Sequence, residues 1–314
     1  MEFSPRMKRN MLTAHAAAVG SMVLLKNVNQ TLPLRPAGSE PLPVAVFGTG
    51  QVRTVLACPD FSLYRGVSIL DGLTASPLVK PDPLLAHKYR AWALSHPTGE
   101  YPWRGLSMEE LSEENAAAIV VLSRDEDAYD PIVNNDELAM IEAVTRAFPR
   151  TVLILNTPGY MEVSQAAALC SAVVYMGIPG QEGGAALSEL LTGEAVFLGH
   201  LNQSWPRRRA DFIQANQVLD IYAGYRYFDT FGTELLYDFG YGLTYGAAEL
   251  AAVAVAVDGK DLVVSAQVVN TGDTWPVSQV VQVYVSRPAG KLPQPKYTLC
   301  GFARTALLEP GRAE

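Results

Sequence analysis

The strongest constraint on the fold is a set of four short apolar runs, each of which ends in glycine or a polar residue. They lie at residues 43–48, 118–123, 151–156 and 172–177, and they are rich in Val, Ile, Leu and Ala. Continuous apolar runs of this length are typical of parallel strands that are covered on both faces. The sequence therefore predicts a buried, mostly parallel sheet.

Helix-length segments separate several of these runs. Leu138, Ile141 and Val144 recur at intervals of three, which places them on one face of a helix. A further helix is expected over residues 181–191, with Gly193 as its stop signal. Strands that alternate with helices predict an α/β fold in which helices sandwich the sheet.

The pattern changes after residue 246. Three alternating apolar runs, at residues 251–257, 262–269 and 277–285, are separated by turn sequences at residues 258–259 and 270–273. This arrangement predicts a small antiparallel β-sandwich. Such sandwiches typically have about 100 residues, so we expect this one to lack strands.

These changes divide the chain into three expected segments. An α/β sandwich domain is expected over residues 1–198, an aromatic-rich connector packed on it over residues 199–246, and the truncated β-sandwich over residues 247–314. Carbohydrate subsites also use aromatic rings, but we interpret the rings of the connector as packing.

The start of the chain has two interpretations. Arg6, Lys8 and Arg9 precede an apolar stretch over residues 11–25, as in a secretory signal. Because Thr13 and other polar residues interrupt this stretch, we favour an amphipathic helix that runs into a short strand. No apolar run reaches the roughly 18 residues that span a bilayer, so we expect no membrane association and a cytoplasmic location.

The net charge and the spacing of the Cys and His residues argue against two classes of function. With 24 basic and 32 acidic residues, the net charge of −8 gives no electrostatic support for binding nucleic acid. Cys58, Cys170 and Cys300 are widely spaced, and the four histidines are scattered. We therefore predict buried thiols, no metal site and no cofactor.

An acidic loop is the main candidate for chemistry. Asp125, Glu126, Asp127 and Asp130 follow the run at residues 118–123 and so occupy a carboxyl-end loop, where α/β sheets place ligand-binding groups. Mutual repulsion raises the pKa of neighbouring carboxyl groups and helps to keep one protonated near neutral pH. Acid-assisted cleavage of a glycosidic bond needs such a group. A calcium-binding loop or a merely solvated one is the alternative.

Two glycine clusters also follow strands. Gly48-Thr49-Gly50 lacks the third glycine of a dinucleotide fingerprint, and we do not interpret it as one. The cluster at residues 177–184 lies at a strand-to-helix junction and permits close backbone approach or an unusual turn.

Together these segments resemble the carboxyl-terminal half of glycoside hydrolase family 3, which includes many β-glucosidases. The most specific motifs are Tyr-Arg-Tyr-Phe-Asp at residues 225–229 and Phe-Gly-Tyr-Gly-Leu-Thr-Tyr at residues 239–245. Residues 16–34 and 175–191 add to the match, and residues 270–302 resemble the family's fibronectin type III-like domain.

The resemblance implies that a β-linked glucoside or oligosaccharide is hydrolysed with retention by two carboxylates. In the family the nucleophilic aspartate lies in a TIM-barrel domain, in a Ser-Asp-Trp-like motif that this sequence lacks. A barrel supplied elsewhere is therefore expected as a partner. Without it, we expect the chain to turn over little substrate.

The family's acid/base loop matches Glu126, although the flanking glycines are altered. Asp125, Asp127 and Asp130 are alternatives for this role, and Arg124, Asp125 and Asp127 are candidates for binding substrate. The alternatives to an acid/base-bearing domain are a non-catalytic carbohydrate-binding or scaffold module and an inert truncated product.

Overall fold

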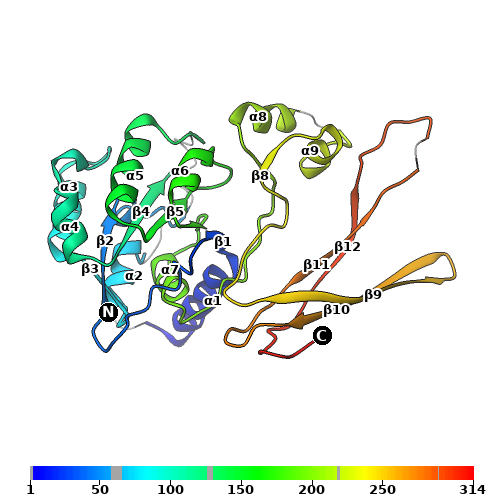
Figure 1. The fold of residues 1–314 in the computed structure, drawn as a ribbon, viewed down its shortest axis with the longest axis horizontal. Coiled ribbons are helices and arrows are strands. Elements are labelled where there is room, and N and C mark those ends of the chain that lie inside the picture. Colours follow the sequence, from blue (N-terminus) through cyan, green and yellow to red (C-terminus); the bar gives the residue numbers. More distant parts are fainter. Residues whose placement is uncertain (1–2, 58–65, 126–129, 218–219, 289) are drawn as a thin grey trace. The chain divides into compact units, whose positions relative to one another are not determined.

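A computed structural model describes residues 3–57, 66–125, 130–217, 220–288 and 290–314. The chain forms two compact units, residues 1–200 and residues 201–314 (Figure 1). The division into three segments, with the connector as a separate one, stays a prediction.

The first unit is built on a central sheet. In the described residues, six strands form it: β1 (Val23–Asn27), β2 (Leu42–Phe47), β3 (Val79–Pro81), β4 (Ala117–Ser123), β5 (Thr151–Asn156) and β6 (Ala172–Tyr175). Their order is β1-β6-β5-β4-β2-β3, and all neighbours are parallel except β1 and β6. Every residue of β5 is buried, as expected for a central strand covered on both faces. The predicted α/β fold with a mostly parallel sheet is confirmed.

Helices cover this sheet in two groups. The helices are α1 (Pro5–Ser21), α2 (Ile69–Ala75), α3 (Pro83–Ser95), α4 (Met108–Glu114), α5 (Asn135–Ala147), α6 (Ser164–Leu169) and α7 (Gly183–Thr192), with the 3₁₀ turns η1 (Thr49–Gln51) and η2 (Trp103–Gly105). Helix α7 contacts α1 and α2, whereas α5 contacts α4 and α6, and Figure 1 shows these two groups on opposite sides of the sheet. The result is a three-layer sandwich.

The predicted helix and strand at the start of the chain are present as α1 and β1. Ser4 caps helix α1, because its side chain accepts the Met7 N–H, and the helix begins at Pro5. None of the helices in the described part of the chain has the length and apolar character needed to cross a bilayer.

Glycines allow α2 and α7 to approach closely. A Cβ atom at Gly184 would lie 1.9 Å from the carbonyl oxygen of Ser68, and one at Gly72 would lie 2.0 Å from that of Gly184. The predicted close backbone approach in the cluster at residues 177–184 is therefore confirmed, and at Gly184 its physical role is packing.

The second unit begins with the aromatic-rich stretch. It contains β7 (Trp205–Pro206), α8 (Arg209–Gln217), α9 (Tyr225–Phe231) and β8 (Leu235–Tyr237). The sequence predicted an extended segment, and the two short helices were missed because their apolar residues follow no clear helical period. The rings pack on one another as predicted: Tyr225 stacks on Phe239 at 5.1 Å between ring centroids, and Trp205 meets Tyr237 edge to face at 6.1 Å.

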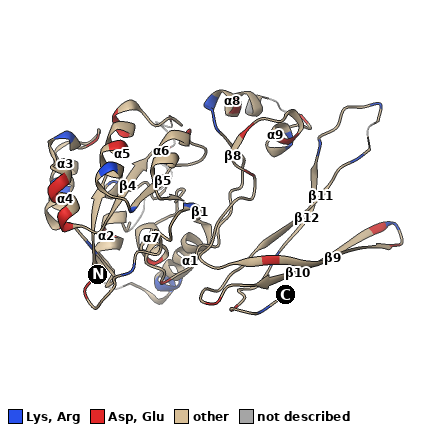
Figure 2. Ribbon diagram, in the orientation of Figure 1, with Lys and Arg blue, Asp and Glu red and all other residues tan. Residues whose placement is uncertain are grey.

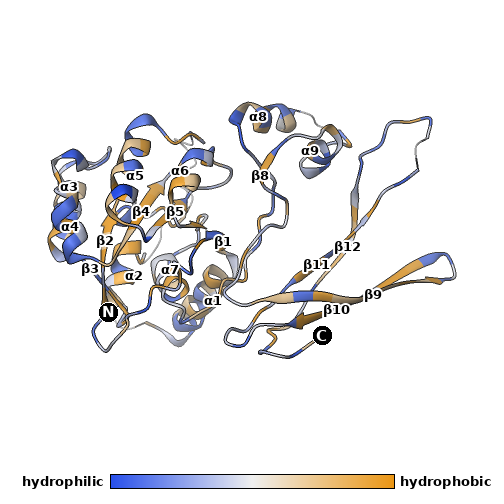
Figure 3. Cartoon of the chain, in the orientation of Figure 1, coloured by the Kyte–Doolittle hydropathy of each residue, from blue (hydrophilic) through white to orange (hydrophobic). Residues whose placement is uncertain are grey.

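The remaining strands form two antiparallel pairs. Strand β9 (Ala248–Asp258) pairs with β10 (Asp261–Asn270), and β11 (Val280–Val285) pairs with β12 (Thr298–Arg304). This confirms the small antiparallel sandwich. Its buried cluster is small, consisting of Val268, Val277 and Leu308 in the described residues, and the apolar residues of β9 and β10 (Figure 3) are largely exposed.

The thiols differ from the prediction that all three are buried. Cys170 is buried, and burial raises the pKa of its thiol to about 12. The prediction is wrong for Cys300, which is exposed on β12 because the apolar side of this strand pair is left uncovered. Cys58 lies outside the described residues.

Candidate functional site

The carboxyl ends of the parallel strands meet at one edge of the sheet. Ser123 at the end of β4 is in register with Asn156 at the end of β5, and β2 and β6 end at the same edge. This is the position where open α/β sheets bind ligands. We call it the carboxyl edge, formed by the segments that follow β2, β4, β5 and β6.

Asn156 ties these segments together from a fully buried position. Its Oδ1 accepts hydrogen bonds from the Val55 N–H at 2.8 Å and from Ser123 Oγ at 3.1 Å. Its Nδ2 donates to the carbonyl oxygens of Val55 and Gly177, both at 2.8 Å, and its backbone oxygen accepts the Arg124 N–H at 3.0 Å. The Asn156 side chain thereby connects the end of β4 with the segments that follow β2 and β6.

The Gly-Thr-Gly sequence lies directly after β2, where Gly48 caps the turn η1 and Thr49 and Gly50 begin it. Gly48 has a φ of 93°, and a Cβ atom on it would lie 2.1 Å from the carbonyl oxygen of Val121. A Cβ atom at Gly50 would lie 2.1 Å from Ser123 Oγ. Both glycines are therefore required for contact between this turn and the end of β4.

Glu100 holds the same turn from the other side. Its two carboxylate oxygens accept the Thr49 N–H at 2.9 and 2.8 Å, and Oε1 also accepts Thr49 Oγ1 at 2.8 Å and the Tyr101 N–H at 2.9 Å. Burial raises the pKa of Glu100 although these hydrogen bonds act to lower it, and the charge of Glu137 raises it further. Sequence analysis missed Glu100, because it lies in an irregular segment without a motif.

Arg124, a predicted substrate-binding residue, makes a dense set of contacts. Its guanidinium donates to the carbonyl oxygens of Ser123 at 2.9 Å, Asp130 at 3.2 Å and Ile132 at 3.0 Å. It also pairs with Glu137 at 2.7 Å, and both side chains are only 14% exposed. These bonds hold the chain on both sides of residues 126–129.

Glu137 connects this arrangement to α5. Its Oε2 accepts the Asn134 N–H at 2.9 Å, while the Asn134 side chain accepts the N–H of Glu137 at 3.0 Å. This reciprocal pair is a capping box at the start of α5. The loop after β4 is thus joined to a well-defined helix start.

The predicted acidic residues are placed only in part. Glu126 and Asp127 lie outside the described residues, whereas Asp125 and Asp130 are exposed at the carboxyl edge. The catalytic and substrate-binding assignments therefore stay predictions. Figure 2 shows acidic residues on helix α4, none of whose residues is buried. The described residues include no cluster of His, Cys, Asp and Glu arranged to hold a metal ion.

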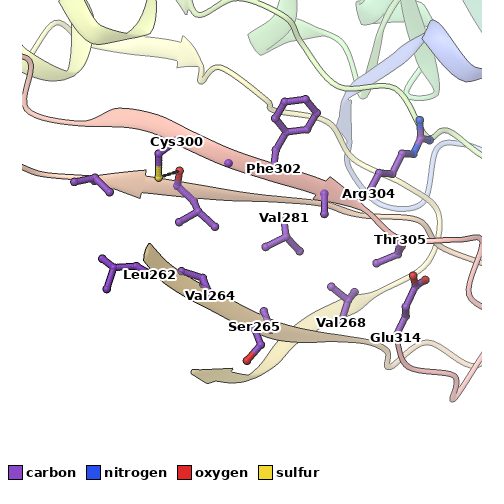
Figure 4. Close-up of a pocket in the computed structure, with 15 residues that line it drawn as sticks. Leu262, Val264, Ser265, Val268, Val281, Cys300, Phe302, Arg304, Thr305 and Glu314 are labelled. Carbon is purple, nitrogen blue, oxygen red and sulfur yellow. Dashed lines mark hydrogen bonds between the residues drawn. The ribbon is translucent and has the colours of Figure 1, made fainter. Parts of the chain in front are cut away.

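A hollow lies within the unit of residues 201–314. It has a volume of about 520 Å³ and lies between β10 and the pair β11–β12 (Figure 4). Val264, Val281, Val283 and Phe302 are among its lining residues. This lining is mainly apolar, as expected for the uncovered interior of a β-sandwich rather than for a hydrolytic site.

The fold defines the class of protein as an α/β sandwich domain, with a carboxyl edge of the kind that binds ligands, followed by small antiparallel sheets. Residues 22–245 match the pattern of the glycosyl hydrolase family 3 C-terminal domain, and residues 279–314 match that of the fibronectin type III-like domain. The chain belongs to glycoside hydrolase family 3.

Solved and curated relatives agree with this assignment. The structure is similar to β-glucosidase 3B from Thermotoga neapolitana in complex with α-D-glucose, with a TM-score of 0.90 and 30% sequence identity over 99% of this chain and 48% of that one. The exo-α-(1→6)-L-arabinopyranosidase of Bifidobacterium breve is 28% identical over 94% of this chain and 41% of its own length. A β-glucosidase of Rhizobium radiobacter is 34% identical over 54% of this chain and 22% of its own. The chain thus spans less than half the length of each of these relatives.

Proposed function

We propose that this chain is the acid/base-bearing portion of a retaining β-glycosidase that hydrolyses O-glycosyl bonds. Glu126 is the proposed acid/base residue, and the proposed substrate is a β-linked glucoside or oligosaccharide. The observation that carries the proposal is that Asp125 and Asp130, on either side of residues 126–129, are exposed after β4 in a family 3 sandwich domain. The glucosidase names of several relatives support the substrate class.

The proposed mechanism needs a second carboxylate. In retaining hydrolysis, the acid protonates the leaving oxygen while a nucleophile about 5–5.5 Å away attacks the sugar. The sequence has no Ser-Asp-Trp motif, so the nucleophile is proposed to come from a barrel domain outside this sequence. We therefore expect the isolated chain to hydrolyse little or no substrate.

The test is an aryl β-glucoside assay of the isolated chain and of the chain mixed with a family 3 barrel domain. Glu126→Gln should abolish any hydrolysis that the mixture shows, and Glu142→Gln, on the exposed face of α5, should leave it unchanged. Parallel variants at Asp125, Asp127 and Asp130 test the alternative acids. Robust hydrolysis by the isolated chain that survives Glu126→Gln would overturn the proposal.

Calorimetric titration with glucose and cello-oligosaccharides separates the enzymatic role from the alternative of a non-catalytic carbohydrate-binding module. Saturable binding by the isolated chain, without hydrolysis in the barrel mixture, would favour the module.

A further inference from the structure

Glu100 is a largely buried carboxylate at the carboxyl edge for which the proposed hydrolysis has no use. Its carboxylate accepts hydrogen bonds from the backbone and side chain of Thr49 and from the backbone of Tyr101. The titratable groups that face it are Tyr89 on α3, the adjacent Tyr101 and Glu137 on α5. Burying the Glu100 carboxylate near a second carboxylate and two phenol groups costs free energy. The hydrogen bonds that Glu100 accepts must offset this cost.

A series of contacts connects Glu100, through the turn that contains Thr49, with the end of β4. The neighbouring Gly50 touches Ser123 so closely that it admits no Cβ atom. Ser123 Oγ in turn donates to Asn156, whose backbone oxygen accepts the Arg124 N–H at 3.0 Å. A displacement of the turn η1 would therefore displace the residues from which the acidic loop departs.

We propose that Glu100 is a positioning residue of this site: its carboxylate holds η1 against Ser123 and thereby fixes the backbone of Ser123 and Arg124 at the end of β4. Its link to hydrolysis rests on the proposed function. The positioning itself does not, because every contact in the argument lies within the described residues of the first unit.

Amide hydrogen exchange of the full chain, followed at single residues by NMR, tests the proposal without substrate. Glu100→Ala leaves the Thr49 N–H without its acceptor, whereas the Tyr101 N–H keeps Thr49 Oγ1 as an acceptor at 3.0 Å. Exchange should therefore be about tenfold faster or more at Thr49 and also at Arg124. Glu142→Gln, an exposed carboxylate on α5, is the control and should match the unsubstituted chain at both amides. Acceleration at Thr49 with Arg124 unchanged would overturn the proposal.

Amide protection can also be measured as a function of pH. If Glu100 acted only locally, protection at Arg124 would not change with the protonation of Glu100. Burial raises the pKa of Glu100 in the closed turn, and opening returns the pKa toward 4.5, so the closed turn binds the proton more tightly. Protection, corrected for the intrinsic exchange rate, should be greatest below pH 4.5 and should fall in parallel at Thr49 and Arg124 as the pH rises through the raised pKa. Glu100→Gln should remove this pH dependence at both amides.

If Glu100→Ala fails to fold, Thr49→Val serves as the second variant. It keeps the shape of the side chain and removes the hydroxyl that donates to Glu100. Severalfold faster exchange at Arg124 supports the proposal, and an unchanged rate there overturns it. The exchange rates are measured without substrate and do not depend on hydrolytic activity. Failure of the proposed function and failure of the positioning role are therefore distinguishable.

Discussion

The guanidinium of Arg124 and the carboxylate of Glu137 lie 2.7 Å apart and join the end of β4 to the first turn of α5. Because Glu137 also accepts the Asn134 N–H, the same carboxylate completes an ion pair and a helix cap. This pair anchors the segment in which the candidate acid/base residue lies.

Loss of Arg124 should destabilise the first unit strongly. Arg124→Met leaves Glu137 as a largely buried charge without its partner, and we expect the free energy of unfolding to fall by about 3 kcal/mol. The control is Arg90→Met, because Arg90 and Asp71 form a pair of which each side chain is about half exposed. That change should cost less than about 1 kcal/mol. Urea denaturation measures both, and equal losses would contradict the assignment.

The contact between α2 and α7 should not tolerate a methyl group. Gly184→Ala places a Cβ atom 1.9 Å from the carbonyl oxygen of Ser68, so the helices must separate at a cost of about 3 kcal/mol or more. Gly20→Ala in α1 is the control, since its Cβ atom meets nothing within 4 Å. Alanine there should raise stability by up to about 1 kcal/mol. Thermal unfolding of both variants checks the contrast, and an unchanged midpoint for Gly184→Ala would refute it.

The two described thiols should differ in reactivity. Cys300 is exposed and should react with Ellman's reagent at pH 8 within minutes, whereas Cys170 is buried with a thiol pKa of about 12 and should not. The experiment uses the Cys58→Ser variant, so that only these two thiols contribute. Unfolding in urea should expose Cys170 to the reagent. If two thiols per native chain reacted quickly, Cys170 would not be buried.

The isolated chain should self-associate through the hairpin β9–β10. Val257 and Leu262 are cross-strand partners with 76% and 65% of their surface exposed, and they belong to a larger apolar face. Replacing both by lysine should reduce the association seen in sedimentation velocity as concentration rises. Leu94→Lys, at an isolated exposed leucine on α3, is the control and should have no such effect. A chain that stays monomeric at all concentrations would contradict this prediction.

Much of the local structure could be predicted from sequence. The apolar runs at residues 118–123 and 151–156 became β4 and β5, and the helical period of Leu138, Ile141 and Val144 became α5. These predictions hold because side-chain periodicity and burial on both faces leave direct patterns in the sequence. The helices α8 and α9 escaped prediction because their apolar residues follow no clear helical period, and the rings of α9 pack on one another and on neighbouring rings instead.

The candidate site was only partly predictable. The acidic loop could be assigned to the carboxyl edge because a loop that directly follows a parallel strand must lie there. Glu100 and Asn156 could not be recognised as site residues. Their roles depend on contacts with Thr49 and Val55, at separations of 51 and 101 positions in the chain.

By itself, the sequence determined the alternation of strands and helices, the change to antiparallel strands after residue 246 and the family to which the chain belongs. Only the tertiary structure determined the strand order β1-β6-β5-β4-β2-β3 and the meeting of Glu100 with η1 and of Arg124 with Glu137. The physical reason is that local periodicity fixes which face of an element is buried. Which distant elements share that buried surface depends on how the whole unit packs.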